Sequence, residues 1–159
     1  VSQMLELASH PEIIKAVIDS NEQFAVMDKR DEYIDTKDKE WVMQPKNQNS
    51  PFMNALIENN ISKILKTKAV ISTTEFGDVY FPKILLTNAY GVNIANTIRT
   101  DDYKQSDEQW WNNAKKEYVQ IREVHWDDNA KIYSADIVIR IDDSNGRFIG
   151  VLRATTPIR

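Results

Sequence analysis

Apolar residues recur at helical spacing through the first third of the chain. One stripe follows Pro11, a residue that suits the first position of a helix, and residues 4–8 indicate a further helical segment upstream. Another stripe follows the cap-like pair Ser50–Pro51, with these members: Phe52, Met53, Leu56, Ile57, Ile61, Ile64 and Leu65. We interpret the polar stretch between the stripes, residues 29–49, as an irregular connection anchored by Trp41.

After Lys68 the pattern changes to an alternation with a period of two residues, and β-branched and aromatic residues become more frequent. This pattern predicts strands over these ranges: 79–87, 92–98, 118–126, 131–141 and 147–155. A short helix is expected at 107–116 with Ser106 as its cap, and Pro82 indicates an edge position for the first strand. Asn145–Gly146 is typical of a tight hairpin turn.

The order of these elements predicts an α+β fold, because a run of helices precedes a run of antiparallel strands. We expect one domain of 159 residues, in which a helical part at about 1–68 packs on a five-stranded antiparallel sheet at about 69–159. Alternation along strand 131–141 places Ile137 and its apolar partners on one face, and Asp136 with Val138 on the other.

Composition narrows the possible functions. A formal net charge of −4 leaves no basic excess for binding nucleic acid. With no cysteine and only two histidines, we expect no disulfide, thiol nucleophile, metal site or cofactor. No apolar run reaches the roughly 18–20 residues of a membrane span. Since the chain begins at Val1 and not at methionine, we expect it to be a fragment whose membrane anchors lie outside it.

The sequence has no signature of catalysis. It contains no glycine-rich phosphate loop, no HExxH motif and no GxSxG motif, and we therefore expect this domain not to be an enzyme. The carboxylate pairs Asp127–Asp128 and Asp142–Asp143 fall in predicted turns, where aspartate is common.

The segment from Asp101 to Trp111 is the most informative for function. It places Tyr103, Trp110 and Trp111 beside several carboxylates, Glu108 among them. Aromatic faces with acidic neighbours form suitable walls for small cationic or amphipathic ligands. The alternative is that the indoles anchor the short helix on the sheet. Adjacent helical residues point about 100° apart, so one of the two indoles is expected in the core.

Asp136 is a second candidate, because a carboxylate on a half-apolar strand face needs a partner. The partner is either a protein cation, such as Arg122 or Arg140, or a ligand amine. His125, which stands beside Trp126 at a strand end, is interpreted as a surface or packed residue.

Four segments of the chain resemble the Cache family, the PAS-like extracytoplasmic sensor domains of prokaryotic histidine kinases, chemoreceptors and cyclases. They are residues 83–91, 92–97, 103–111 and 139–152, and the resemblance extends over about residues 10–156. Its more specific pieces are the turn that ends in Tyr90-Gly91, the run Asp107-Glu108-Gln109-Trp110-Trp111, and the pattern Asp-x-x-Gly-x-x-x-Gly-Val-Leu at 143–152.

The resemblance implies a PAS-like sheet behind a long N-terminal helix, in a sensor domain that lies in the periplasm or outside the cell. Flanking transmembrane helices, absent from this fragment, would anchor the whole protein, and an output domain such as a histidine kinase would lie inside the cell. In this family a small molecule binds between the sheet and the segment that covers it. Apart from the resemblance, a homodimer through the N-terminal helices is a further hypothesis.

The resemblance also implies a set of site residues. Tyr103, Trp110 and Trp111 fall on the spacing of a family motif that binds amino acids, whereas the arginine position of that motif holds Glu108. The family aspartate that holds the ligand amine falls at Asp127–Asp128. The expected ligand is an amine, an amino acid or a small organic acid. The candidate ligand-binding residues are Tyr103, Glu108, Trp110, Trp111, Arg122, Asp128 and Asp136.

Two other functions stay open. A cone-type α+β enzyme would use Asp136 and His125 as an acid–base pair, although the strand register indicates that these side chains need not converge. A ligand-free dimerisation module would pair the N-terminal helices through Ile13, Val17 and their apolar neighbours, and its sheet face would be filled, with no cavity.

Overall fold

Six helices and eight strands make up the part of the chain that the computed structural model describes, residues 1–69, 72–74, 77–79, 81–129 and 131–158. The helices are α1 (Ser2–Ala8), α2 (Pro11–Ala25), α3 (Arg30–Met43), α4 (Pro51–Glu58), α5 (Asn60–Ala69) and α6 (Gln109–Ala114). The strands are β1 (Ser72–Thr74), β2 (Gly77–Val79), β3 (Lys83–Asn88), β4 (Asn93–Asn96), β5 (Val119–Ile121), β6 (His125–Asp127), β7 (Ile132–Asp142) and β8 (Phe148–Pro157).

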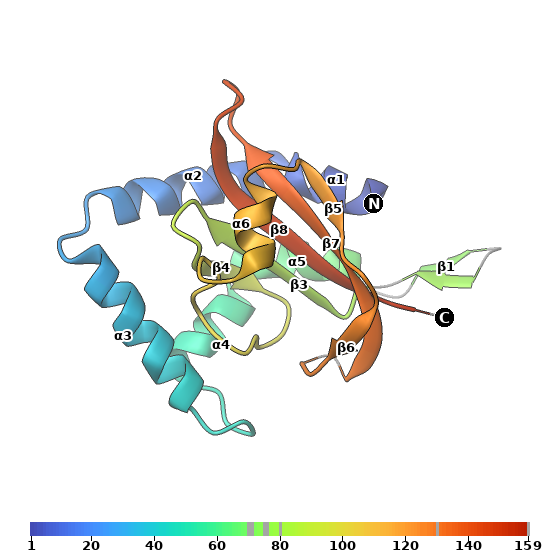
Figure 1. Cartoon of the computed structure of the whole chain (residues 1–159), viewed down its shortest axis with the longest axis horizontal. Coiled ribbons are helices and arrows are strands. Elements are labelled where there is room, and N and C mark those ends of the chain that lie inside the picture. Colours follow the sequence, from blue (N-terminus) through green and yellow to red (C-terminus); the bar gives the residue numbers. More distant parts are fainter. Residues whose placement is uncertain (70–71, 75–76, 80, 130, 159) are drawn as a thin grey trace.

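An antiparallel sheet with the order β4-β3-β8-β7-β5 runs through the centre of the fold, and β6 pairs with β7 beyond the end of β5. The predicted strand at 118–126 is therefore two short strands, β5 and β6, and the sheet has six strands instead of the expected five. β1 and β2 form a separate hairpin that projects from one end of the molecule (Figure 1).

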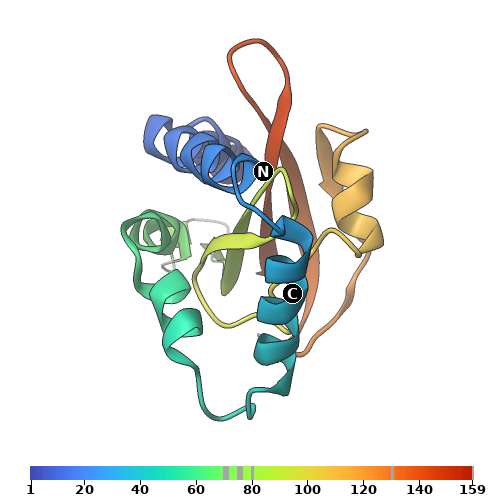
Figure 2. The same ribbon diagram turned by 90° about the vertical axis from the view of Figure 1, so that its left-hand side faces the viewer.

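The sheet is covered on both faces. Helices α1, α2, α4 and α5 lie on one side of it and α6 lies on the other (Figure 2). On β7, Ile137 and Ile139 face the first layer, in one cluster with Ile13 of α2, while Val138 packs against Trp111 of α6. The α+β fold and the alternation predicted for β7 are confirmed, because a pleated strand sends successive side chains to opposite faces.

The N-terminal helical region is divided at His10. Its ring Nδ1 accepts a hydrogen bond from the backbone N–H of Glu12 at 3.1 Å, which caps α2, and Pro11 takes the first helical position as expected. The long N-terminal helix implied by the family resemblance is thus α2, of 15 residues, preceded by the short α1. None of the helices in the described residues combines the length and the apolar character that crossing a bilayer requires.

Residues 30–43 form helix α3, and the prediction of an irregular connection was wrong. Only Ile34 and Trp41 are buried in this helix, and two residues seven positions apart make a stripe too narrow to stand out against a polar sequence. The anchoring role of Trp41 is confirmed, since the side chain is buried and its indole N–H donates to the backbone oxygen of Thr100 at 2.7 Å.

The second apolar stripe is interrupted at Asn59, where α4 ends and α5 begins. Asn59 Oδ1 accepts a hydrogen bond from the N–H of Ser62 at 2.8 Å, and its Nδ2 donates to the carbonyl oxygen of Ile94 at 2.9 Å. A single asparagine therefore starts α5 and ties it to the edge strand β4. The predicted cap at Ser50 is present, with its hydroxyl accepting from the N–H of Met53 at 3.2 Å.

Strand β3 lies inside the sheet, between β4 and β8, and the edge position inferred from Pro82 was wrong. The proline precedes the first residue of the strand, so it removes no donor from the ladder. Residue 80 of the predicted strand and residue 130 of the predicted turn at 127–130 lie outside the described residues. The hairpin turn at Asn145–Gly146 is confirmed, with a φ of 75° at the glycine.

A loop at residues 97–108, which we call the cover loop, crosses the sheet before α6. Gln105 N–H donates to the carbonyl oxygen of Gly91 at 2.6 Å, and a Cβ atom at Gly91 would lie 2.3 Å from the Cβ of Ser106. Asp38 of α3 accepts from the N–H groups of Tyr103 and Lys104 at 3.1 and 3.0 Å. The close approach at Gly91 and the carboxylate of Asp38 thus fix the loop from two sides.

Candidate functional site

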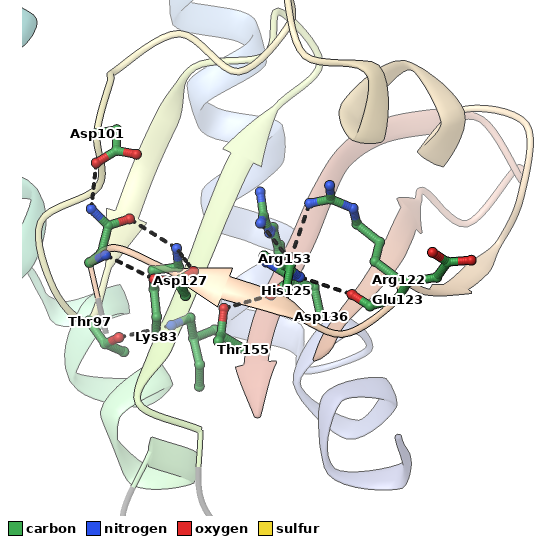
Figure 3. Close-up of polar contacts among 12 residues, drawn as sticks. Lys83, Thr97, Asp101, Arg122, Glu123, His125, Asp127, Asp136, Arg153 and Thr155 are labelled. Atoms are coloured by element: carbon green, nitrogen blue, oxygen red, sulfur yellow. Dashed lines mark hydrogen bonds and ion pairs between the residues drawn. The ribbon is translucent and has the colours of Figure 1, made fainter. Parts of the chain in front are cut away.

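A cavity of about 290 Å³, here called the polar cavity, lies on the α6 side of the sheet, under the cover loop. Trp110 of α6 and Trp126 of β6 contribute aromatic surface to its lining. The basic members of the lining are Lys83, Arg122, His125 and Arg153, and the acidic members are Asp101, Asp102, Glu108, Asp127 and Asp128. Charges of both signs therefore face one small space (Figure 3).

Asp136 holds the basic side of the cavity in place from behind. Its side chain is fully buried, and its Oδ2 atom accepts hydrogen bonds from Arg153 at 2.5 Å and Arg122 at 3.2 Å and lies 3.2 Å from Nε2 of His125. Its Oδ1 atom accepts from the hydroxyl of Thr155 at 2.8 Å. Asp136 thus has protein partners on both oxygens, and it positions two guanidinium groups instead of lining the space itself.

Strand register brings this cluster together. Thr155 of β8 pairs directly with Asp136 of β7, and Arg153 lies two residues along β8, on the same face. The guanidinium of Arg153 also lies 4.5 Å from the ring centroid of Trp110. Burial, and then the nearby charge of Arg153, lower the pKa of Arg122, whose side chain is 37% exposed.

A second ion pair forms the floor of the cavity, between Lys83 of β3 and Asp127 of β6. Lys83 Nζ lies 2.5 Å from Asp127 Oδ2 and 3.0 Å from Asn129 Oδ1, and both charged side chains are buried. Asn129 in turn donates to Asp101 of the cover loop at 2.7 Å, so the contacts run from the sheet up to the loop (Figure 3). Burial, and then the charge of Arg153, lower the pKa of Lys83.

The acidic wall is different, because two of its carboxylates are held by no hydrogen bond or ion pair from the described residues. Within the described residues, neither Asp102 nor Glu108 makes a side-chain hydrogen bond or an ion pair. Burial raises the pKa of Asp102 to about 7, and the negative charges of Asp38 and Glu108 raise it further in the same direction. A cation placed in the cavity would lower the free energy of both carboxylates.

Among the residues that the structure describes, two groups of side chains have the donor types of a metal site. In one, ligand atoms of His125, Asp127 and Asp136 lie within 4.8 Å of one another, but lysine and arginine already occupy these carboxylates. Protein cations in such contact oppose the binding of a further cation. The other group, Asp102, Asp107 and Glu108, is part of the acidic wall just described.

The structure brings together some of the predicted site residues and separates others. Glu108, Trp110, Arg122 and Asp128 line the polar cavity, and Asp136 lies directly behind its basic wall. Asp128 is exposed at the rim, where a hydrogen bond from Lys131, together with the charge of that residue, lowers its pKa.

Trp111 and Tyr103 do not line the cavity. Trp111 is buried against the sheet, and its indole N–H donates to the hydroxyl of Thr87 at 2.9 Å. One indole in the core and one on the cavity is the arrangement expected for adjacent helical residues. Tyr103 points to the opposite side of the cover loop, where its ring packs against Trp41 and Phe52. The expected wall of three aromatic residues therefore retains only Trp110.

Sequence reasoning missed the cations Lys83 and Arg153, which line the cavity. The sequence could have identified both, because each is a charged residue inside an apolar strand and therefore needs a buried partner. Arg140, considered as a partner of Asp136, instead contacts Asp142 at 2.6 Å. The other suggested partner, Arg122, does contact Asp136.

His125 and Asp136 do converge, contrary to the expectation from the strand register. β6 sets His125 opposite Ser134 on β7, and Asp136 is the next residue of β7 on that face. The ring Nδ1 of His125 lies 2.9 Å from the carbonyl oxygen of Glu123, and its Nε2 faces Asp136. Both ring nitrogens thus face protein oxygens, which leaves no nitrogen to exchange a proton with a substrate in this arrangement.

The sequence matches no protein family and no curated protein in searches of both kinds. Structural comparison finds similarity to the ligand-binding domain of the Campylobacter jejuni chemoreceptor Tlp3 in complex with 4-methylisoleucine, with a TM-score of 0.44 and 17% identity. The ligand-binding domain of the Pseudomonas aeruginosa PAO1 amino acid chemoreceptor PctC in complex with GABA gives 0.41 and 11%. The extracellular domain of rpHK1S-Z16, described as a histidine kinase, gives 0.42 and 15%.

Each of these comparisons covers 98% of the present chain. The chain itself spans 59% of the Tlp3 domain, 64% of the PctC domain and 54% of the rpHK1S-Z16 domain.

Proposed function

We propose that this chain is an extracytoplasmic sensor domain of a membrane-bound signalling receptor, and that the polar cavity is where it binds a small molecule. The observation that carries the proposal is the pair of carboxylates, Asp102 and Glu108, which make no side-chain hydrogen bond or ion pair with the described residues and face the cavity opposite a basic wall fixed by Asp136. A partly buried carboxylate that no cation neutralises costs stability, and a bound cation would remove that cost.

The ligand that suits this geometry is a small amine or a zwitterion such as an amino acid. An ammonium group fits between Asp102 and Glu108, next to the indole of Trp110. Two guanidinium groups share the single carboxylate of Asp136, so the basic wall keeps attraction for a ligand carboxylate. A small organic acid without an amine would use only the basic wall.

Signalling requires a ligand that binds one conformation more tightly than another. Strand β8 carries Arg153 and Thr155 into the site and is the final element of the chain. On the other face of the sheet, α1 and α2 pack against β8. A shift of Arg153 toward a ligand carboxylate is thus transmitted directly to the two terminal regions of the domain.

The family resemblance supports the wider setting of the proposal. In it, residues 1–159 form one sensor domain without enzyme activity of its own, on the periplasmic or extracellular face of the membrane. The full protein is anchored by flanking transmembrane helices and carries an output domain such as a histidine kinase. Pairing of the N-terminal helices in a homodimer would use their outer surfaces, because Ile13 and Val17 are buried against the sheet.

The alternatives have less support. A ligand-free dimerisation module requires a filled sheet face, whereas a cavity of about 290 Å³ lies there. Acid–base catalysis by Asp136 and His125 requires an accessible group, whereas Asp136 is fully buried and both nitrogens of His125 face protein oxygens.

Thermal denaturation in the presence of small amines, amino acids and small carboxylates tests the proposal. A ligand at 100 times its Kd stabilises the native state by about 2.7 kcal/mol, which corresponds to a rise in Tm of roughly 5–10 °C for a domain of this size. The double variant Asp102→Asn, Glu108→Gln should lose the rise, while Tyr118→Phe, a change on the exposed surface, should keep it. Equal responses of the double variant and the parent chain would count against this site.

A further inference from the structure

A second hollow, which we call the apolar groove, lies on the helical side of the sheet, between α2, α4 and the edge strand β4. Its volume is about 610 Å³, and it shares no lining residue with the polar cavity. The side chains that matter for its chemistry are Phe24, Met27, Tyr33, Phe52, Leu56 and Tyr103. Small-molecule sites typically have a volume of about 300–1,000 Å³ and mainly apolar and aromatic walls.

Two pairs of aromatic rings build the walls of this groove. Phe24 of α2 meets Tyr33 of α3 edge to face at 6.1 Å between ring centroids, and Phe52 of α4 meets Tyr103 of the cover loop at 5.1 Å. The rings come from four separate elements of the fold. Because each ring is held by its partner, the walls are set before any ligand arrives.

The lining of the groove also contains the polar residues Asp19, Ser20, Gln23 and Asn93, and the hydroxyl of Tyr103 is a polar group among its aromatic walls that lacks a described partner. The residue is 2% exposed, yet its hydroxyl makes no hydrogen bond with any residue that the structure describes. Burial raises the pKa of this phenol, and the nearby Tyr33 raises it further, so it stays a neutral donor. Because Tyr103 lines the groove and no described residue accepts its proton, the hydroxyl can donate a hydrogen bond to an oxygen or nitrogen of an occupant.

The charged groups around the groove favour a neutral occupant over a charged one. Asp19 at the rim pairs with Lys15 at 2.7 Å. The ammonium of Lys37 lies 4.9 Å from the ring centroid of Phe52 and 5.9 Å from that of Tyr33. These rings already interact with a cation of the chain, which opposes a ligand cation, and the lining contains no cation to hold an anion.

We propose that the apolar groove is a second ligand site that binds a neutral aromatic molecule. The molecule would contact the rings of the groove, and one of its oxygen atoms would accept a hydrogen bond from the Tyr103 hydroxyl. This site is distinct from the polar cavity, because it uses other residues, another face of the sheet and the opposite ligand chemistry. Its ligand is neutral and apolar, where that of the polar cavity is charged.

Four probes of similar size separate the contributions of the ring, the acceptor oxygen and the charge to binding. Acetophenone has a ring and an acceptor oxygen, and ethylbenzene has nearly the same shape without the oxygen. Benzylammonium and benzoate add a charge of either sign. Two-dimensional ¹H–¹⁵N NMR titration of the chain measures each Kd and shows which backbone amides respond. We expect acetophenone to bind most tightly and to shift amides of α2, α4 and β4, and both charged probes to bind more weakly.

Variants test the role of the hydroxyl. Tyr103→Phe keeps the ring and should raise the Kd of acetophenone about fivefold, the value of one hydrogen bond of about 1 kcal/mol, without changing that of ethylbenzene. Tyr90→Phe is the matched control, since Tyr90 packs against the same cluster but does not line the groove. Leu56→Trp should fill the groove and abolish binding of both neutral probes.

Several results would overturn the proposal. Equal affinities for acetophenone and ethylbenzene, or an unchanged acetophenone Kd in Tyr103→Phe, would show that the hydroxyl makes no hydrogen bond to the ligand. Shifts confined to residues around the polar cavity would place the probe in the other site. A concentration-dependent dimer in sedimentation experiments that Leu56→Trp disrupts would show that a second copy of the chain covers the groove. Tyr103→Phe keeps the test valid even if Leu56→Trp fails to fold.

Discussion

Arg153 donates a hydrogen bond of 2.5 Å to Asp136, although the two residues stand on neighbouring strands and Asp136 is sealed from solvent. The same carboxylate also contacts Arg122 and His125, so one buried acid holds three basic side chains. This arrangement makes Asp136 the part of the site on which both the fold and the basic wall depend most.

We expect Asp136→Ala to lower the free energy of unfolding by about 3–5 kcal/mol, because it leaves Arg153 and Arg122 together without their counter-ion. Asp142→Ala is the control, since its pair with Arg140 is about one quarter exposed and should contribute about 1 kcal/mol or less. Urea denaturation of both variants measures the difference. Similar losses in the two variants would show that the buried cluster around Asp136 contributes no more to stability than the partly exposed pair of Asp142 and Arg140.

Asp102 should make stability depend on pH. Its pKa is raised to about 7 in the folded chain, above the ordinary value of 3.8, so the folded state binds the proton more tightly than the unfolded state does. Stability should therefore fall as pH rises from about 4 to about 7 and then level off. Asp102→Asn should remove this fall and stabilise the free domain at pH 8 by about 2 kcal/mol, allowing for solvent screening.

Tm values of the parent chain and of Asp102→Asn between pH 4 and pH 8 provide the measurement. Parallel curves for the two proteins would contradict the raised pKa. The same titration applies to the ligand, because a protonated Asp102 has no charge to offer. The affinity for an amine should therefore weaken as pH falls below about 7.

Trp111 and Trp126 should differ sharply in their contribution to stability. Trp111 is buried and donates a hydrogen bond to Thr87, so Trp111→Ala should cost about 3–5 kcal/mol. Trp126 is 49% exposed, and Trp126→Ala should cost about 1 kcal/mol or less. Guanidinium denaturation distinguishes the two. A mild effect of Trp111→Ala would mean that this indole is not part of the core.

Gly91 should tolerate no side chain, in contrast to Gly146. Both have positive φ angles, 79° and 75°, so alanine costs about 1 kcal/mol of backbone strain at either site. At Gly91 the new Cβ would also lie 2.3 Å from Ser106 Cβ, whereas Gly146 has nothing within 4 Å. Gly91→Ala should therefore lower the free energy of unfolding several times more than Gly146→Ala does.

Hydrogen exchange gives a second test of the Gly91 prediction. The clash would push the cover loop away from the β3–β4 turn, so the N–H of Gln105, which donates to Gly91, should exchange faster in Gly91→Ala. Unchanged protection at Gln105 in that variant would show that the loop is held elsewhere.

Local patterns were sufficient to predict the parts of the fold that depend on nearest neighbours. The alternation along β7 identified the two faces of the strand because pleating is a property of the backbone itself. Helix α3 escaped prediction because its stability comes from tertiary contacts of two side chains, Ile34 and Trp41. No window of sequence shows that Trp41 will reach Thr100.

The candidate site was predictable only in part for a similar reason. Trp110 and Glu108 could be identified because aromatic residues stand beside acids in one short segment. The direction of Tyr103 could not, since it depends on how Asp38 of a different helix binds the backbone of the cover loop. The pairing of Arg153 with Asp136 requires the register of two long strands, which the sequence alone leaves undetermined.

Asp102 and Tyr103 are joined by one peptide bond, and they face the polar cavity and the apolar groove respectively. A rotation of the backbone that draws one side chain toward an occupant alters the position of the other. We therefore expect occupancy of the two hollows to be coupled by a single interaction free energy of either sign. By reciprocity, whatever an apolar molecule does to the affinity for an amine, the amine does in equal measure to the affinity for the apolar molecule.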